Sequence, residues 1–166
     1  MMAQTLNDKE KAKEVICALL NDTGFSGFSF DTSFKLRFYR NKTAKYNGKT
    51  LPWEVQINIL TEWWFGSKED WLSKVSRMSC GKVQEQDEPV KAYELACLRW
   101  IEGSEVKKVT VNDHIMEILF QNGKLISMLL ESEEDYAWTI EETNVNESNA
   151  LWSVTCENCE LFVRTP

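Results

Sequence analysis

The feature that most constrains the fold is the alternation of apolar and polar residues in the stretch WEVQINILTEWWF, residues 53–65. A β-strand turns successive side chains to opposite faces, so one parity is predicted to face a core and the other to face solvent. The predicted core parity contains Trp53, Val55, Ile57, Ile59, Thr61, Trp63 and Phe65. The opposite parity contains Glu54, Gln56, Asn58, Leu60, Glu62 and Trp64. Because the run is long for one strand, a bend or bulge is expected within it.

Three segments carry helical patterns. Apolar residues recur at helical spacing between residues 6 and 20, with Asn7 or Asp8 as the predicted cap and Gly24 as the stop. Ser67 is predicted to cap a second helix, SKEDWLSKVSRM, whose apolar stripe includes Trp71. The Ala, Leu and Glu content of VKAYELACLRWIEG, which closes on a glycine, predicts a third helix.

Alternation also predicts strands outside the tryptophan-rich stretch. In FKLRFY, residues 34–39, the three apolar residues Phe34, Leu36 and Phe38 share one face. Further along, Asn122–Gly123 separates two apolar runs and is the preferred central pair of a type I′ hairpin, which would set Phe120 opposite Leu125. Since both faces of this hairpin are largely apolar, we expect it to be central and covered on both sides.

Together these patterns predict a single α+β domain over residues 1–166, a mostly antiparallel twisted sheet with two or three helices. Residues 1–79 and 90–166 are predicted to be pseudo-repeats of a helix-plus-meander unit that share one core. Each runs through an apolar helix, a glycine, a short strand, a polar turn, an apolar strand and an asparagine, and then enters a strand with a tryptophan. The polar segment 80–89 is the predicted loop between them.

The chain has a net charge of −7 at pH 7. This acidity argues against binding to nucleic-acid phosphates or to an anionic membrane, and it favours a basic protein or a cation as partner. We expect a cytoplasmic protein, because the chain has no apolar run of membrane-spanning length, no apolar signal-peptide core, and five irregularly spaced cysteines. No sequence motif of nucleotide binding or nucleophilic catalysis occurs, so neither an enzyme activity nor a cofactor is expected.

Cys156 and Cys159 form the one CxxC pattern in the chain. They fall in a last predicted hairpin that turns at Glu157–Asn158 and pairs Val154 with Leu161, which places both cysteines on its apolar face. Buried structural thiols are the first interpretation. A reversible disulfide and a metal site are alternatives, although zinc needs four ligands and no second CxxC or histidine pair is present.

The stretch EVKKVTVNDHIMEILFQNGKLISMLLESEEDYAWTIEE carries a further pattern: an apolar strand, F-x-N-G, a second apolar strand, an acidic turn and a W-x-I strand. Over residues 100–142 this pattern resembles small acidic bacterial proteins of unknown function, several of which look like immunity proteins of polymorphic toxin systems. The resemblance implies a bacterial protein that works by binding another protein, and it implies no catalytic residues.

A candidate binding surface lies on the polar parity of the tryptophan-rich strand. Interface hot spots favour Trp, Tyr and Arg, and the strand before it would add an arginine and a tyrosine to this face. The candidates are Glu54, Gln56, Asn58, Glu62 and Trp64, with Arg37 and Tyr39. The alternative is that the C-terminal half covers this face and buries Trp64. The acidic run ESEEDY adds Glu133, Glu134 and Asp135, which would raise the association rate with a basic partner.

The sequence therefore predicts a non-catalytic protein-binding domain, with an immunity or inhibitor role as its particular form. A small-ligand or carbohydrate-binding module that uses the Trp64 face is the alternative. The same face could also join two copies of the chain into a homodimer.

Overall fold

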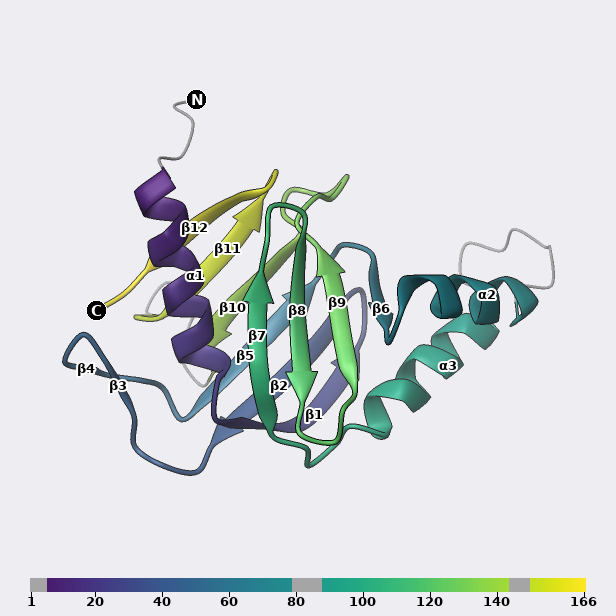
Figure 1. Cartoon of the computed structure of the whole chain (residues 1–166), viewed down its shortest axis with the longest axis horizontal. Helices are drawn as coiled ribbons and strands as arrows, with labels where there is room; N and C mark the ends of the chain where they lie inside the picture. Colours follow the sequence, from purple (N-terminus) through teal and green to yellow (C-terminus); the bar gives the residue numbers. More distant parts are fainter. Residues whose placement is uncertain (1–5, 79–87, 144–149) are drawn as a thin grey trace.

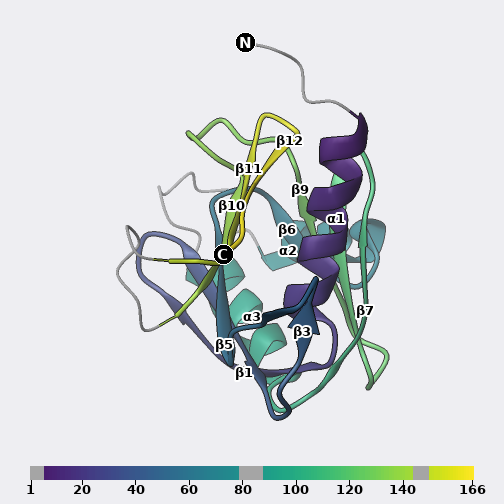
Figure 2. The ribbon, with the colours of Figure 1, turned by 90° about the vertical axis from the view of Figure 1, so that its left-hand side faces the viewer.

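A computed structural model describes residues 6–78, 88–143 and 150–166. The protein consists of two packed layers (Figures 1 and 2). One layer is a six-stranded sheet, and the other is a four-stranded sheet flanked by helix α1. Every strand pair among the described residues is antiparallel, so the predicted α+β class with a mostly antiparallel sheet is confirmed.

The six-stranded sheet has the order β1-β2-β5-β10-β11-β12. Its strands are β1 Thr23–Phe30, β2 Phe34–Arg40, β5 Glu54–Ile59, β10 Trp138–Glu142, β11 Ser153–Glu157 and β12 Glu160–Arg164. The four-stranded sheet has the order β6-β9-β8-β7. Its strands are β6 Trp63–Phe65, β7 Val106–Val111, β8 Ile115–Phe120 and β9 Leu125–Leu129. A separate short hairpin is formed by β3 Lys45–Tyr46 and β4 Lys49–Thr50.

Three helices in the described ranges complete the fold: α1 Leu6–Leu20, α2 Lys68–Met78 and α3 Glu88–Arg99. Helix α1 packs beside β7 and over β11 and β12, so it covers the part of the large sheet that the small sheet does not reach (Figure 1). Helices α2 and α3 lie together on the opposite side of the small sheet. None of the helices in the described part of the chain is long and apolar enough to cross a membrane.

The core lies between the two layers. The rings of Phe25, Phe38 and Phe120 meet there, with centroid separations of 5.5 Å, 6.1 Å and 6.4 Å. All three side chains are buried, and so is the predicted apolar stripe of α1, which consists of Ala12, Val15, Ile16, Leu19 and Leu20. Since apolar burial contributes roughly 25 cal/mol per Å², this interlayer contact dominates the stability of the fold.

A buried arginine joins α1 to the large sheet. Arg40, at the end of β2, donates hydrogen bonds to the carbonyl oxygens of Ala18, Leu19 and Asn21. These carbonyls belong to the end of α1, where helix carbonyls have no partners within the helix and the helix dipole favours a cation. Arg40 therefore acts as a C-terminal cap supplied by another element.

Each half of the chain contributes a strand that pairs with a strand of the other half. The first half runs α1, β1, β2 and β5, and its next strand, β6, pairs with β9 of the second half. The second half runs α3, β7, β8 and β9, and its next strand, β10, pairs with β5 of the first half. This order supports the hypothesis of two pseudo-repeats, which stays a prediction. The predicted inter-repeat loop 80–89 falls mostly outside the described residues, and α3 already begins at Glu88.

The predicted phase of the tryptophan-rich stretch is right in its middle and wrong at its ends. Val55, Ile57 and Ile59 are buried as expected. Trp53, however, is 51% exposed, because β5 begins only at Glu54 and Trp53 lies in the bend before it. The expected bend occurs at residues 60–62, where the chain leaves the large sheet and enters the small one.

This bend also reverses the expectation for Trp64. Trp63 and Trp64 begin a new strand, β6, so their burial does not follow the parity of β5. Trp63 packs edge-on against Phe34 at 5.1 Å between ring centroids. Trp64 is only 4% exposed, and the ammonium of Lys68 lies 4.6 Å from its ring centroid. Both tryptophans are therefore part of the core.

Two predicted turns are displaced by one position. At Asn122–Gly123 the hairpin has a longer loop, in which Phe120 N donates to Lys124 O and Gly123 has a φ of +83°. The pairing is Leu119 opposite Leu125, rather than Phe120, because a glycine in this conformation adds a bulge residue. The hairpin is central in its sheet, as predicted, but its outward face is only half-buried.

The last hairpin turns at Asn158–Cys159, not at Glu157–Asn158. Both turn residues have positive φ, 49° and 64°, as a type I′ turn requires. As a result Val154 pairs with Val163, and Cys156 pairs with Leu161.

Candidate functional site

The structure offers three candidate sites, and the exposed residues among the predicted binding candidates fall in the first two. The first place is the outward face of β2 and β5, which pair as the prediction required. Arg37 lies opposite Gln56, and Tyr39 lies opposite Glu54, while Asn58 pairs with Lys35. These side chains are exposed or half-buried, and no described helix lies over them (Figure 2). Trp64 is not on this face, since it lies buried in the other sheet.

The second place is an edge formed by two chain segments that cross between the sheets. Residues 60–62 lead from β5 to β6, and residues 130–137 lead from β9 to β10. Backbone hydrogen bonds join the two segments at their ends. Leu60 N donates to Ala137 O at 2.9 Å, and Leu129 N donates to Glu62 O at 3.1 Å. The hydroxyl of Thr61 also donates to the carbonyl oxygen of Glu131.

This crossing gathers acidic side chains that are far apart in sequence. We call the exposed set Glu62, Glu131, Glu133 and Glu134 the acidic edge. It surrounds an open hollow of about 520 Å³. The predicted candidates Glu62, Glu133 and Glu134 therefore lie together, and Asp135 is an exposed neighbour in the same loop. Within the edge only Glu62 has an ion pair in the described structure, with Lys68 at 3.4 Å.

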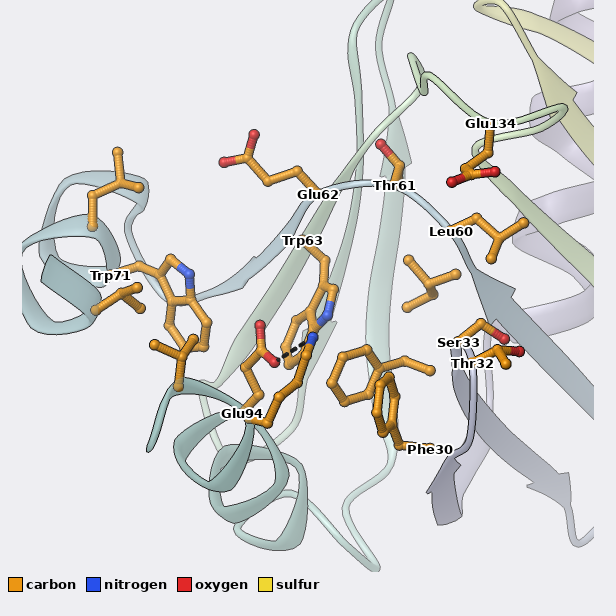
Figure 3. A pocket seen from close by; sticks show the side chains of 16 residues that line it. Phe30, Thr32, Ser33, Leu60, Thr61, Glu62, Trp63, Trp71, Glu94 and Glu134 are labelled. Carbon is orange, nitrogen blue, oxygen red and sulfur yellow. Dashed lines mark ion pairs between the residues drawn. The ribbon is translucent and has the colours of Figure 1, made fainter. Parts of the chain in front are cut away.

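The third place is a pocket that the sequence did not predict. It lies beside the acidic edge, between the β1–β2 turn, β6 and helices α2 and α3, and it holds about 400 Å³ (Figure 3). We call it the aromatic pocket and define it by Phe30, Phe34, Trp63, Trp71, Lys91 and Glu94. Its volume lies within the range of about 300–1,000 Å³ that is typical of ligand sites.

The aromatic rings of the pocket form a continuous row. Ring centroids are 4.7 Å apart for Phe30 and Phe34, and 5.6 Å apart for Trp63 and Trp71. Phe34 and Trp63 connect the two pairs. The row starts at a half-exposed residue, since Phe30 is 37% exposed, whereas the two tryptophans are buried. One end of the row is therefore open to solvent.

Two charged side chains from α3 enter this apolar setting. The Lys91 ammonium lies 5.0 Å from the ring centroid of Phe30 and 4.7 Å from that of Phe34. It also lies 3.1 Å from Oε2 of Glu94, although the geometry is not that of a hydrogen bond. In the view of Figure 3, the Glu94 carboxylate lies between the indoles of Trp63 and Trp71.

Glu94 is nearly inaccessible, at 9% exposure. Burial raises the pKa of its carboxyl, because the charged form loses its hydration, and the Lys91 ammonium opposes this only in part. A carboxyl in such surroundings gains from any further donor or cation that reaches it, since a buried charge with incomplete hydrogen bonding is costly.

Cys156 and Cys159 form no disulfide, and each thiol has a hydrogen-bond acceptor nearby. Cys156 Sγ donates to Leu130 O at 3.3 Å, and Cys159 Sγ lies 3.7 Å from Oε1 of Glu131. Burial, with a smaller effect of Cys159, raises the pKa of the Cys156 thiol to about 12. The pKa of Cys159 is also raised, by burial and then by the charge of Glu131. Protonated thiols are weak nucleophiles, so this geometry favours a structural role.

Sequence reasoning missed Lys91 and Glu94 because they lie on a helix that contains no recognisable motif. Their spacing of three residues puts them on one face, and that was the only available signal. The aromatic rings come from β1, β2, β6 and α2, so their convergence depends on the tertiary fold. By these features the chain is a two-layer α+β protein with an acidic edge beside an aromatic pocket. Comparisons with protein-family models, curated proteins and solved structures gave no match.

Proposed function

We propose that the protein is a non-catalytic binding domain that binds a basic protein through the acidic edge. The observation that carries this proposal is the convergence of four exposed carboxylates from two crossing segments around one hollow. Such a field raises the association rate with a positively charged surface and selects against acidic partners. The net charge of −7 adds to the same effect.

An immunity or inhibitor role in a bacterial cytoplasm is the particular form that we propose. An inhibitor needs a rigid surface with a charge opposite to that of its target, rather than a reactive group. Backbone hydrogen bonds join the two segments of the acidic edge, which supports such a fixed arrangement. The raised pKa values of Cys156 and Cys159 agree with a role that uses no thiol nucleophile.

Affinity capture from cells that carry the gene tests the proposal. The variant Glu131→Lys/Glu133→Lys reverses two charges of the acidic edge, and Glu10→Lys/Glu105→Lys makes the same change in net charge at exposed positions elsewhere. We expect the wild type and the second variant to retain a basic protein, identified by mass spectrometry, that the first variant loses. Titration calorimetry with the purified partner should then show weaker binding at higher salt.

The particular role has its own readout. Expression of the captured partner alone should arrest growth, and co-expression of the wild-type chain should restore it. A partner that both variants bind equally would show that the acidic edge is not the binding surface. A partner that causes no growth defect would leave a binding domain but remove the immunity role.

A second candidate function is supported by a different observation. The carbohydrate alternative can no longer use Trp64, but Trp53 and Tyr39 are 51% and 48% exposed and line a hollow of about 360 Å³ with Glu54. Aromatic faces beside carboxylates suit a hydroxylated ligand. Saccharides should then quench tryptophan fluorescence in the wild type and not in Trp53→Ala. An equal response of both proteins would exclude this site.

A further inference from the structure

We propose that the aromatic pocket binds a cationic side chain, an arginine or lysine, of the basic partner. This proposal deepens the proposed function and rests on it, because the pocket adjoins the acidic edge and shares Glu62 and Glu134 with it. In Figure 3 these two carboxylates lie at the upper edge of the pocket, on either side of Thr61. A cation drawn to the acidic edge would therefore reach the mouth of the pocket.

The charges of the pocket lining favour a cation. Three carboxylates, those of Glu62, Glu94 and Glu134, line the pocket together with one ammonium, that of Lys91, and Glu62 is also paired with Lys68 outside the lining. Glu94 is the deepest of the three, and its Oε2 is approached only by the Lys91 ammonium, at 3.1 Å and without good hydrogen-bond geometry. A guanidinium or ammonium group could supply that hydrogen bond, and charge-assisted hydrogen bonds are roughly twice as strong as neutral ones.

The rings of the pocket also favour a cation. The face of an aromatic ring carries partial negative charge and attracts an ammonium or guanidinium group within about 6 Å of its centroid. Lys91 already makes this contact with two rings, at 5.0 Å and 4.7 Å. Its ammonium thus occupies, within the free protein, the type of position that the partner's cation would take.

Lys91 is well suited to be displaced. It extends from α3 on a flexible side chain that is about one third exposed, so it can turn to solvent without a change in the helix. The Phe30–Phe34 face and the Glu94 carboxylate would then receive the incoming side chain. An arginine fits particularly well, because its planar group can stack on a ring and hydrogen-bond a carboxylate at once.

A peptide titration tests this site directly. The probe is an acetylated, amidated Gly-Arg-Gly peptide, and its control contains citrulline, which has nearly the shape of arginine without the charge. Binding is followed by NMR through the indole N–H signals of Trp63 and Trp71, assigned with single Trp→Phe variants. We expect a saturable shift of these signals with the arginine peptide and at least about tenfold weaker binding of the citrulline peptide.

Two variants in the pocket distinguish a cation site from other sites. Glu94→Gln keeps the shape and removes the charge, so it should weaken arginine-peptide binding about tenfold. Lys91→Met removes the resident ammonium and should strengthen binding several-fold. Glu105→Gln, exposed and outside the pocket lining, is the matched control and should bind like the wild type.

Three results would overturn the proposal. They are equal binding of the arginine and citrulline peptides, no saturable shift of either indole signal, and loss of binding in Lys91→Met, which would show that the arginine side chain does not replace the Lys91 ammonium. The outcome is separable from that of the proposed function, because Glu131 and Glu133 do not line the aromatic pocket. Peptide binding that fails while acidic-edge-dependent capture persists would refute the pocket alone, and the reverse result would refute the proposed partner surface alone.

Discussion

Two clusters of aromatic rings in this protein have similar spacings between ring centroids but differ in exposure and in their polar neighbours. The rings of Phe25, Phe38 and Phe120 are enclosed between the two sheets and are buried. The row of the aromatic pocket has comparable centroid distances but ends at the half-exposed Phe30 and includes a lysine and a glutamate. Ring packing alone therefore does not decide between a core and a site.

The difference comes from what encloses the rings. Between the sheets, two apolar faces meet and enclose the rings of Phe25, Phe38 and Phe120. At the pocket, a short three-residue strand meets two helices, and such curved elements do not fill the space between them. The charged residues of α3 reach this space because their side chains are long. The following predictions test this contrast, from the largest expected effect to the smallest.

The largest effect is expected for Phe120→Ala in the enclosed cluster. Loss of a fully buried ring leaves a cavity that two sheets cannot close, so the free energy of unfolding should fall by about 3–5 kcal/mol. Urea denaturation with an unchanged m-value would measure this. A loss below about 1 kcal/mol would show that the interlayer contact yields easily and that the two clusters do not differ in kind.

Trp64→Ala and Trp53→Ala form a pair with opposite expectations. Truncation of the buried Trp64 should lower the free energy of unfolding by about 3 kcal/mol, whereas truncation of the half-exposed Trp53 should change it by no more than about 0.5 kcal/mol. Both can be compared by urea denaturation under the same conditions. The reverse order would mean that one uninterrupted strand runs through residues 53–65, as the alternation alone indicated.

A smaller loss, about 1 kcal/mol, is expected for Phe30→Ala. Phe30 is partly exposed, but its removal takes one ring from Phe34 and one cation–π contact from Lys91. Thermal melts should show a modest decrease. A loss as large as that of Phe120→Ala would mean that the aromatic pocket is closed in solution.

The smallest effect concerns Glu94→Gln, and it depends on pH. Burial raises the pKa of the Glu94 carboxyl in the folded protein. The folded protein therefore favours the protonated carboxyl. Its contribution to the free energy of unfolding is fully present below the unfolded-state pKa, about 4.3, and it is lost as the pH rises through the folded-state pKa. The stability of the wild type relative to Glu94→Gln should fall between acidic and neutral pH. Denaturation at a series of pH values measures this, and a relative stability that rises with pH would contradict it.

Much of the architecture could be predicted from local pattern. The stripe of α1, the buried face of β5 and the cap of α2 by Ser67, which accepts a hydrogen bond from Asp70 N at 3.2 Å, follow from spacing and capping rules. These features depend on residues within one element. Errors arose at element ends, at Trp53 and Trp64, where a single change of strand resets the parity.

The candidate site was predictable only in part. The acidic run that contains Glu133 and Glu134 is visible in the sequence, and so is Glu62, but their meeting depends on the crossing of two inter-sheet connections. The aromatic pocket draws its residues from β1, β2, β6, α2 and α3, and no one of these segments signals a pocket by itself.

The sequence by itself determined the kinds of element in this protein, which are two or three helices and a mostly antiparallel sheet, together with its acidic net charge. Periodicity and capping act over a few residues, and net charge needs no structure at all. Only the tertiary structure decided that Trp64 is core, that Trp53 is at the surface and that Glu94 lies among aromatic rings. Burial of a side chain depends on which distant element packs over it, and this is a property of the whole chain.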